Sequence, residues 1–210
     1  MELRDIAQMY QLCSQVMLIG MTDDLLPKIY QLPAFMHLDR RSSDDWKADH
    51  YALFGMTIYP FETEFLSEDG VLGGRVTDSV VRVYYEAGYR PDESEPVDHM
   101  GNQLGLMALL CDEEADARKD DVIQAILHTT QLQRRFLDKH LLCWLPALVI
   151  DTPGRDDRFV DEHPDVAVAR FRPTVVVQRE AAYLIRTLYL GPLIPRAALV
   201  ALRNRVLPVL

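Results

Sequence analysis

The sequence predicts an all-α protein, a single helical bundle of about seven to eight helices. Three observations support this prediction. Apolar residues recur at intervals of three and four along most segments, which is the period of an amphipathic helix. Glycine, proline and short polar residues fall at the ends of these segments, where helices start and stop. No internal repeat, heptad run or low-complexity segment occurs in the 210 residues.

The first helix is predicted to end near Gly20. Its apolar stripe comprises Leu3, Ile6, Met9, Tyr10, Cys13, Val16 and Met17. Thr22 and the two aspartates after it are expected to start a second helix. Pro27 and Pro33 allow only short helical pieces there, before the polar loop at 39–43.

A third helix is expected to begin at Ser42, because Ser42 and Asp45 have the spacing of a capping box. This helix is predicted to end close to Gly55. The following segment, residues 58–66, is predicted to be extended because Pro60 disfavours a helix there.

The segment before Gly88 is predicted to be a helix that this glycine terminates. Its many valines favour a strand on propensity alone. The i, i+4, i+7 spacing of its apolar residues favours a helix instead. These residues are Val76, Val80, Val83, Tyr84 and Ala87.

Two more helices are predicted before residue 146. Asp98 is expected to cap the first, in which Gly101 and Gly105 let a neighbouring element approach closely. The second, from about residue 115 to residue 142, would be about 40 Å long at 1.5 Å per residue. Its buried stripe is expected to comprise Val122, Ile126, Thr129, Leu132, Phe136 and His140.

The domain organisation is predicted as an acidic helical domain at 1–150, followed by C-terminal helices at 151–210 that pack into the same fold. The polar, turn-rich stretch 151–165 joins the two parts. Helices are predicted at 173–191 and 195–206. Because the joining stretch is long, the C-terminal helices can be exchanged between two chains, and we expect a monomer or a domain-swapped dimer.

Charge is distributed unevenly along the chain. Residues 151–210 contain nine Lys and Arg and seven Asp and Glu, so residues 1–150 contain 13 basic and 25 acidic side chains. Such a surface repels nucleic acid and anionic lipid, which argues against nucleic-acid binding. It attracts basic peptides.

No membrane insertion is predicted, because the longest apolar runs are far shorter than the roughly 20 residues that cross a bilayer. The N-terminus lacks the basic start of a signal peptide, so a cytoplasmic location is expected. Cys13, Cys111 and Cys143 lie in apolar helical contexts and are predicted to be buried thiols. Without a C-x-x-C pair they do not indicate a metal site, and no cofactor is predicted.

The most informative motif is Glu95-Pro96-Val97-Asp98-His99. Pro96 makes the backbone of Glu95 extended, and His99 is expected in the first turn of the next helix. There the helix field lowers the imidazole pKa and Asp98 raises it. His99 can therefore titrate near neutrality, in a direction that the sequence leaves open.

Five segments in this order resemble the signatures of the TorD/DmsD family, which are cytoplasmic chaperones that mature molybdenum-containing redox enzymes. Residues 95–99 resemble the signature E-x-P-x-D-H, and residues 51–55 resemble Y-x-x-L-F-G. Residues 60–65 resemble P-W-E-S-x-Y, and residues 140–146 match H-L-x-x-W-x-P. Residues 83–88 are similar to the family helix that ends in an aromatic residue and a glycine.

Three features depart from the family pattern. Gln103 stands where the family usually has Glu, which keeps hydrogen bonding but removes a charge. Phe61 replaces the usual Trp and loses an indole donor. The stretch 21–44 is short for the helices that the family places there.

The resemblance implies a chaperone that binds the N-terminal twin-arginine signal of a molybdoenzyme precursor, and the folded body of that precursor, before export. Such a signal is a basic turn followed by an apolar helix, so it needs an acidic rim beside an apolar groove. The expected groove comprises Tyr51, Phe54, Phe61, Phe65, Trp144 and Leu145. The expected rim comprises Glu62, Glu95 and Asp98. The candidate signal-peptide-binding residues are Tyr51, Leu53, Phe54, Pro60, Phe61, Glu62, Glu95, Pro96, Asp98, His99, Gln103 and Trp144.

The apolar groove is expected to set the affinity for this peptide. Burying some 400 Å² of apolar surface yields on the order of 10 kcal/mol before ordering costs. An exposed Arg-carboxylate pair contributes at most about 1 kcal/mol, so the carboxylates set specificity and on-rate. We therefore expect Phe54→Ala to weaken peptide binding more than Asp98→Asn.

Two other functions remain open at this point. One is an assembly chaperone or adaptor for a redox enzyme that is not exported, of the nitrate-reductase type. The other is a metal-dependent helical hydrolase built on Asp98-His99 with His128 and His140. Its dyad would need His before Asp, and His128 and His140 lie about 120° apart around one helix. His140 is better interpreted as a satisfied core histidine packed under Trp144.

Overall fold

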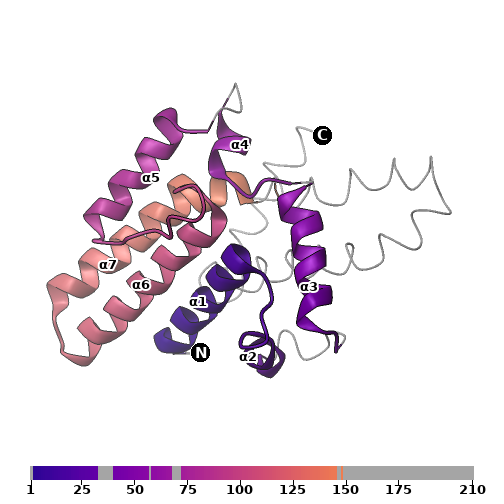
Figure 1. The fold of residues 1–210 in the computed structure, drawn as a ribbon. Coiled ribbons are helices and arrows are strands. Elements are labelled where there is room, and N and C mark those ends of the chain that lie inside the picture. The colour runs from indigo at the N-terminus through magenta and orange to yellow at the C-terminus, as the bar shows by residue number, and fades with distance from the viewer. Residues whose placement is uncertain (1, 33–39, 57, 68–71, 146–147, 149–210) are drawn as a thin grey trace, which may run out of the picture.

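A computed structural model describes residues 2–32, 40–56, 58–67, 72–145 and 148. Within these residues the protein is all-α and contains seven α-helices, which confirms the predicted fold class (Figure 1). The predictions for 151–210 lie outside the described residues. No helix in the described part of the chain is long and apolar enough to cross a membrane.

Helices α1 (Leu3–Ile19), α6 (Met100–Lys119) and α7 (Ile123–Phe136) form the centre of the bundle (Figure 1). Both α1 and α7 pack against α6. All residues of α6 from Met100 to Cys111 except Leu109 are buried. A helix that is buried on all sides belongs in the middle of a bundle, and α6 is therefore the central helix.

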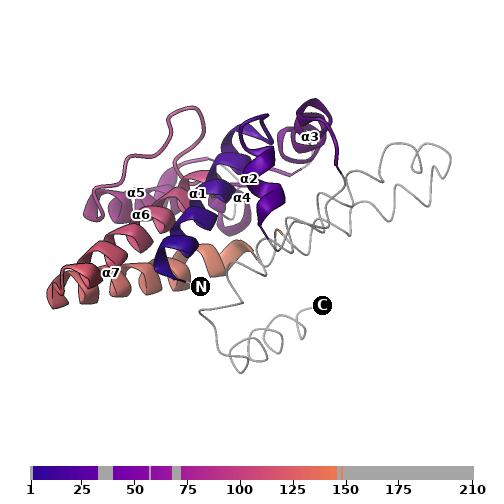
Figure 2. The same cartoon turned by 90° about the horizontal axis from the view of Figure 1, so that it is seen from below.

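The remaining helices lie on two sides of this centre. Helix α5 (Gly74–Glu86) lies on the side of α6 and α7, whereas α2 (Leu26–Gln31) and α3 (Ser43–His50) lie beyond α1 (Figure 2). The larger cluster of buried apolar side chains lies among α1, α5, α6 and α7. A smaller cluster joins α1, α2 and α3 through Val16, Leu25, Leu26, Ile29 and Trp46.

The ends of the first three helices follow the sequence signals. Gly20, with φ +73°, ends α1 as predicted. The Ser42 hydroxyl accepts the N–H of Asp45 (3.2 Å) and so caps α3. The helical segment then continues as a π-helix, η2 (Tyr51–Gly55). It ends at Gly55, as predicted. Helix α2 has only six residues and carries Pro27 in its first turn, which confirms the short helical piece predicted there.

The next two helical predictions have different outcomes. The valine-rich segment is helix α5, and Gly88 follows it with φ +65°, as the apolar spacing predicted. The single helix predicted at 115–142 is wrong. Residues 112–119 belong to α6, and a tight turn at 120–122 separates α6 from α7. Asp121 occupies the left-handed region there (φ +54°), which aspartate tolerates better than most residues.

A short helix replaces part of the segment predicted to be extended at 58–66. Residues 58–61 are not helical, as Pro60 requires, but helix α4 (Glu62–Leu66) follows at once. The backbone N–H groups of Glu62 and Thr63 donate to the carbonyl (3.1 Å) and the carboxylate (2.9 Å) of Asp98. Because Asp98 lies 35 residues after Thr63, the residues next to α4 do not reveal where this helix begins.

Helix α7 continues as a π-helix, η3 (Leu137–Leu141), and residues 142–145 are α-helical again, so the helical segment runs past the predicted end near residue 142. Along its predicted stripe the later residues are buried, Ile126 is half-buried and Val122 is exposed. The buried members are Thr129, Leu132, Phe136 and His140.

The cysteine prediction is confirmed at two positions and wrong at one. Cys13 and Cys111 are buried thiols, whereas Cys143 is exposed. His140 and Trp144 take the buried side of that last helical turn, which leaves Cys143 facing outward.

Glycines bring α6 close to its neighbours, as predicted. The Gly101 carbonyl accepts the hydroxyl of Ser14 on α1 (2.7 Å). A Cβ atom at Gly101 would lie 2.5 Å from Cγ of Leu18, and one at Gly105 would overlap the Tyr89 hydroxyl. A side chain at Gly101 would displace Leu18 on α1, and a side chain at Gly105 would displace the Tyr89 hydroxyl.

Gly101→Ala is accordingly expected to lower the free energy of unfolding by about 1–3 kcal/mol, because the added methyl group pushes α1 away from α6. In an unobstructed helix the same change stabilises by up to about 1 kcal/mol. Urea denaturation gives the difference. Adding Leu18→Ala should recover part of the loss, and full additivity of the two losses would contradict the steric explanation.

Candidate functional site

The signature turn is built differently from the sequence prediction. The N-cap of α6 is His99, whose Nδ1 accepts the N–H of Gly101 (3.0 Å), so the prediction that Asp98 caps this helix is wrong. Burial, with a smaller contribution from His50, lowers the pKa of His99 to about 4. The imidazole is therefore neutral at physiological pH, as an accepting Nδ1 requires, and does not titrate near neutrality.

Asp98 instead caps helix α4 across the fold. Its carboxylate accepts both the backbone N–H and the hydroxyl of Thr63, and Asp98 itself is almost fully buried. The backbone pairs Phe61 with His99, and Met100 N–H donates to the Pro60 carbonyl (2.8 Å). The Pro60 segment and the signature turn are thus held side by side. Thr63 is a residue that sequence reasoning missed.

A second buried network joins the motif at 140–146 to the motif at 60–65 and to the helix that follows the signature. Glu62 accepts hydrogen bonds from His140 Nδ1 (2.9 Å) and from Gln103 Nε2 (2.7 Å). The Gln103 oxygen accepts the indole N–H of Trp144 (3.3 Å). His140 is the satisfied core histidine that was predicted, with Glu62 as its partner. Its ring lies against Phe136, with 4.9 Å between ring centroids.

The replacement of the family's usual Glu by Gln103 fits this network. Gln103 donates from its amide nitrogen and accepts at its oxygen, and it is fully buried. An ionised carboxylate there would repel the Glu62 carboxylate, at a cost that burial increases. The amide therefore joins Glu62 to Trp144 without a second buried charge.

The loop before the signature is fixed by two polar groups that the sequence prediction also missed. Asn102 donates to the carbonyls of Asp92 and Pro96 (3.1 Å each) and accepts the N–H of Asp92 (2.7 Å). The Tyr84 hydroxyl donates to the Val97 carbonyl (2.9 Å). A polar residue on an otherwise apolar helix was the signal that could have found Asn102.

Most of the predicted site residues form this scaffold and not its surface. The buried ones are Leu53, Pro60, Glu62, Asp98, His99, Gln103 and Trp144. Phe54, Phe61, Glu95 and Pro96 are half-buried, and Tyr51 is exposed. In this structure Glu62 and Asp98 do not form an acidic rim, and Trp144 and Leu145 do not line an open groove, because internal contacts already occupy these side chains.

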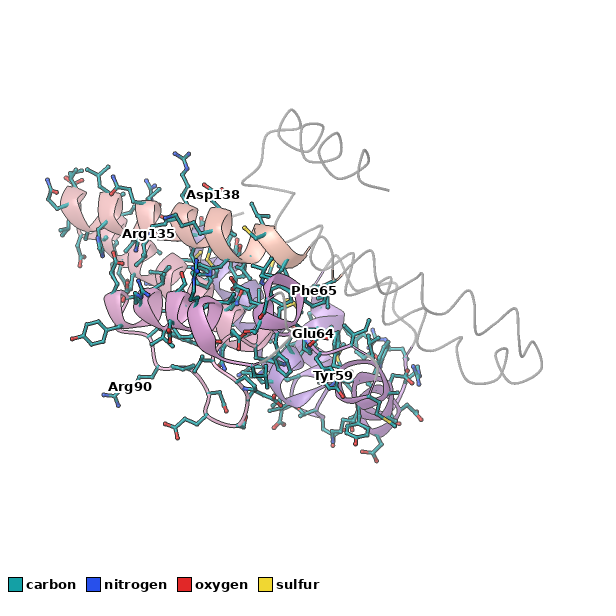
Figure 3. All side chains as sticks on the ribbon, turned by 90° about the horizontal axis from the view of Figure 1, so that it is seen from above. Tyr59, Glu64, Phe65, Arg90, Arg135 and Asp138 are labelled. Atoms are coloured by element: carbon teal, nitrogen blue, oxygen red, sulfur yellow. The ribbon has the colours of Figure 1, made fainter. Side chains whose placement is uncertain are left out.

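Residues 51–66, which include two of the scaffold motifs, carry several apolar side chains that are open to solvent. We call these side chains the aromatic surface; the exposed members are Tyr51, Met56, Tyr59 and Leu66, and the half-buried members are Phe54, Phe61 and Phe65. The rings of Tyr59 and Phe61 stack (6.1 Å between centroids), and Phe61 in turn contacts the ring of His99 (5.5 Å). Tyr59 and Phe65 are labelled in Figure 3, with Glu64 near them.

Exposed carboxylates occur in the two segments that form the scaffold. They belong to Glu64 in the first segment and to Asp92 and Glu93 just before the signature, whereas Glu95 is half-buried. Burial, and to a lesser extent Asp92, raises the pKa of Glu95. Met56, Tyr59 and Leu66 were not among the residues predicted from the sequence, although the dense apolar and aromatic content of residues 51–66 was a usable signal.

Among the described residues, no group of three or more His, Cys, Asp or Glu side chains is arranged to hold a metal ion. His128 is exposed on α7 and His140 is buried against Glu62. These two histidines do not converge on one point, as their helical spacing indicated.

The model of the family described as nitrate reductase delta subunit matches residues 22–149, which is more than half of the chain. The protein belongs to this family. Chaperone protein TorD of Photobacterium profundum is 25% identical over 151 residues, covering 66% of this chain and 67% of that protein. No solved structure matches the chain.

Membership of the nitrate reductase delta subunit family confirms the resemblance to the TorD/DmsD chaperones that the motifs indicated. The protein is a chaperone of redox-enzyme maturation. Both buried networks and the aromatic surface lie within the matched residues.

Proposed function

We propose that this chaperone binds the N-terminal twin-arginine signal of a molybdenum-cofactor enzyme precursor in the cytoplasm and delays export until the cofactor is inserted. The observation that carries the proposal is the aromatic surface, which the signature networks hold in place. Half-buried rings over a rigid scaffold offer a preformed site for an apolar helix at low ordering cost.

The chemistry of the surroundings supports a basic partner. The exposed carboxylates of Glu64, Asp92 and Glu93 come from the segments that flank the signature. They steer a twin-arginine segment at low salt but add at most about 1 kcal/mol per exposed pair. The apolar part of the signal then contributes most of the affinity, since burying some 400 Å² is worth on the order of 10 kcal/mol before ordering costs.

Calorimetric titration with twin-arginine signal peptides of molybdoenzymes, each beside its Lys-Lys variant, tests the proposal. We expect saturable binding of one peptide with a dissociation constant near or below about 1 μM, and weaker binding of its Lys-Lys variant. Raising the salt concentration should reduce the on-rate more than the lifetime of the complex. Absence of binding to every peptide would contradict the proposal.

A second function is favoured by the family description, which names the nitrate reductase delta subunit. In this alternative the client is a redox enzyme that is not exported, and the aromatic surface binds an apolar segment without a twin-arginine pair. Binding of a nitrate-reductase N-terminal peptide, unaffected by replacing its basic residues, would support this alternative. Contact with the folded body of the client, and a monomer or domain-swapped dimer, remain predictions for both functions.

A further inference from the structure

We propose that two copies of this chain associate through the outward face of α7, with their two α7 helices antiparallel. Helix α7 lies at the edge of the bundle (Figure 2). Its outward face carries two large apolar side chains, Ile123 and Leu127, which are 57% and 50% exposed. Neither belongs to the two apolar clusters inside the protein. This face shares no residue with the aromatic surface.

The helical period places Leu127 opposite the core. The buried residues of α7 are Thr129, Leu132, Gln133 and Phe136, which lie on one side of the helix. At about 100° per residue, Leu127 points about 170° away from the middle of that side. No rotation of α7 that keeps Phe136 in the core also buries Leu127. Only an element packed on the outside of α7 can therefore cover this side chain.

Unpaired charges of opposite sign lie at the two ends of the same face. Asp120 and Asp121 are exposed in the turn before α7, and Arg134 is exposed in the last turn of the helix. Within the described part of the chain, none of the three side chains forms an ion pair. Asp121 and Arg134 are about 20 Å apart along the helix, too far to pair with each other. A second molecule has to supply their partners.

The face is complementary to itself, which favours a second copy over an unrelated protein. Asp120 and Arg134 lie at equal distances along the sequence before and after Leu127. A twofold axis at Leu127 therefore brings the two leucines together and sets each Arg134 level with the partner's Asp120. Lys119 then comes within about a turn of the partner's Asp138. A parallel pairing would instead set like charges opposite each other, so the charges select the antiparallel arrangement.

The size of the face predicts a weak dimer. A stable interface buries about 800 Å² on each partner, and one face of a 14-residue helix offers less than that. We expect a dissociation constant of about 10–100 μM. Because the ion pairs at the two ends are exposed, salt should weaken the association.

The test is sedimentation equilibrium of the full chain at low salt, over about 5–300 μM, a range that brackets the expected dissociation constant. We expect the mass to rise from monomer towards dimer. Leu127→Glu should weaken association by about tenfold or more. Asp120→Arg and Arg134→Asp should each weaken it by about tenfold, whereas the double variant should recover it to within about threefold. The matched controls, Val81→Glu and Arg82→Asp, change exposed residues of α5 and should leave association unchanged.

Three results would overturn the proposal, once circular dichroism shows that each variant is folded. The first is a monomer at every concentration. The second is a dimer that Leu127→Glu leaves intact, because such a dimer is joined elsewhere, as by exchange of C-terminal helices. The third is a double variant of Asp120→Arg and Arg134→Asp that associates no better than the single variants. Because no signal peptide is present, the outcome is independent of the proposed function.

Discussion

Glu62→Ala is expected to lower the free energy of unfolding by about 3 kcal/mol or more, because it removes one partner from a buried ion-pair-like contact. His140 and Gln103 both donate to the Glu62 carboxylate, and all three side chains are buried. Without the carboxylate, His140 Nδ1–H stays inside the protein with no partner, and Gln103 Nε2 keeps only its bond to the Asp98 carbonyl (3.2 Å). Urea denaturation followed by circular dichroism measures the loss.

Glu64 offers the matched control, because it lies on the same short helix but faces solvent (Figure 3). Glu64→Ala should change stability by no more than about 0.5 kcal/mol. Glu62→Gln, which keeps the shape and one acceptor, should fall between the two. If Glu62→Ala and Glu64→Ala were equally mild, the network would not hold the three motifs together.

Tyr51→Ala is expected to weaken binding of the twin-arginine peptide by about tenfold or more, because exposed aromatic side chains at the centre of an interface supply most of its energy. Tyr51 is 64% exposed, so its loss should leave the melting temperature nearly unchanged. Calorimetry with the wild-type peptide measures the change in affinity.

Tyr85 provides the control for this experiment. It is 89% exposed and lies near the end of α5, about 16 Å along that helix from the end that meets α4. Tyr85→Ala should leave peptide affinity unaltered. An equal loss of affinity in both proteins, or none in Tyr51→Ala, would refute the assignment of the aromatic surface.

The structure gives a different reason for expecting Phe54→Ala to weaken peptide binding more than Asp98→Asn. Asp98 is buried and its carboxylate accepts from Thr63, so Asp98→Asn should act mainly by weakening the cap of α4. Phe54 is half-buried beside His50, with 5.2 Å between ring centroids, and belongs to the aromatic surface. Phe54→Ala therefore remains the larger expected loss in peptide affinity.

Local physics explains what the sequence alone determined. Helices α1, α3 and α5 lie where apolar spacing and end signals placed them, because Gly20, Ser42 and Gly88 satisfy or terminate a helix within a few residues. The ordered motifs also identified the chaperone family. The helix ends depend on contacts between residues that are close in the chain, and the family assignment depends on the order of the motifs along it.

Tertiary contacts decided what the sequence left open. Asp98 caps α4, 35 residues before it, while His99 takes over the cap of α6. Glu62 and His140 are 78 residues apart in the chain and form a hydrogen bond. Glu62, which was predicted to lie on an acidic rim, is therefore buried. A polar side chain adopts whichever role satisfies its hydrogen bonds at the least desolvation cost, and that choice depends on partners that only the folded chain brings within reach.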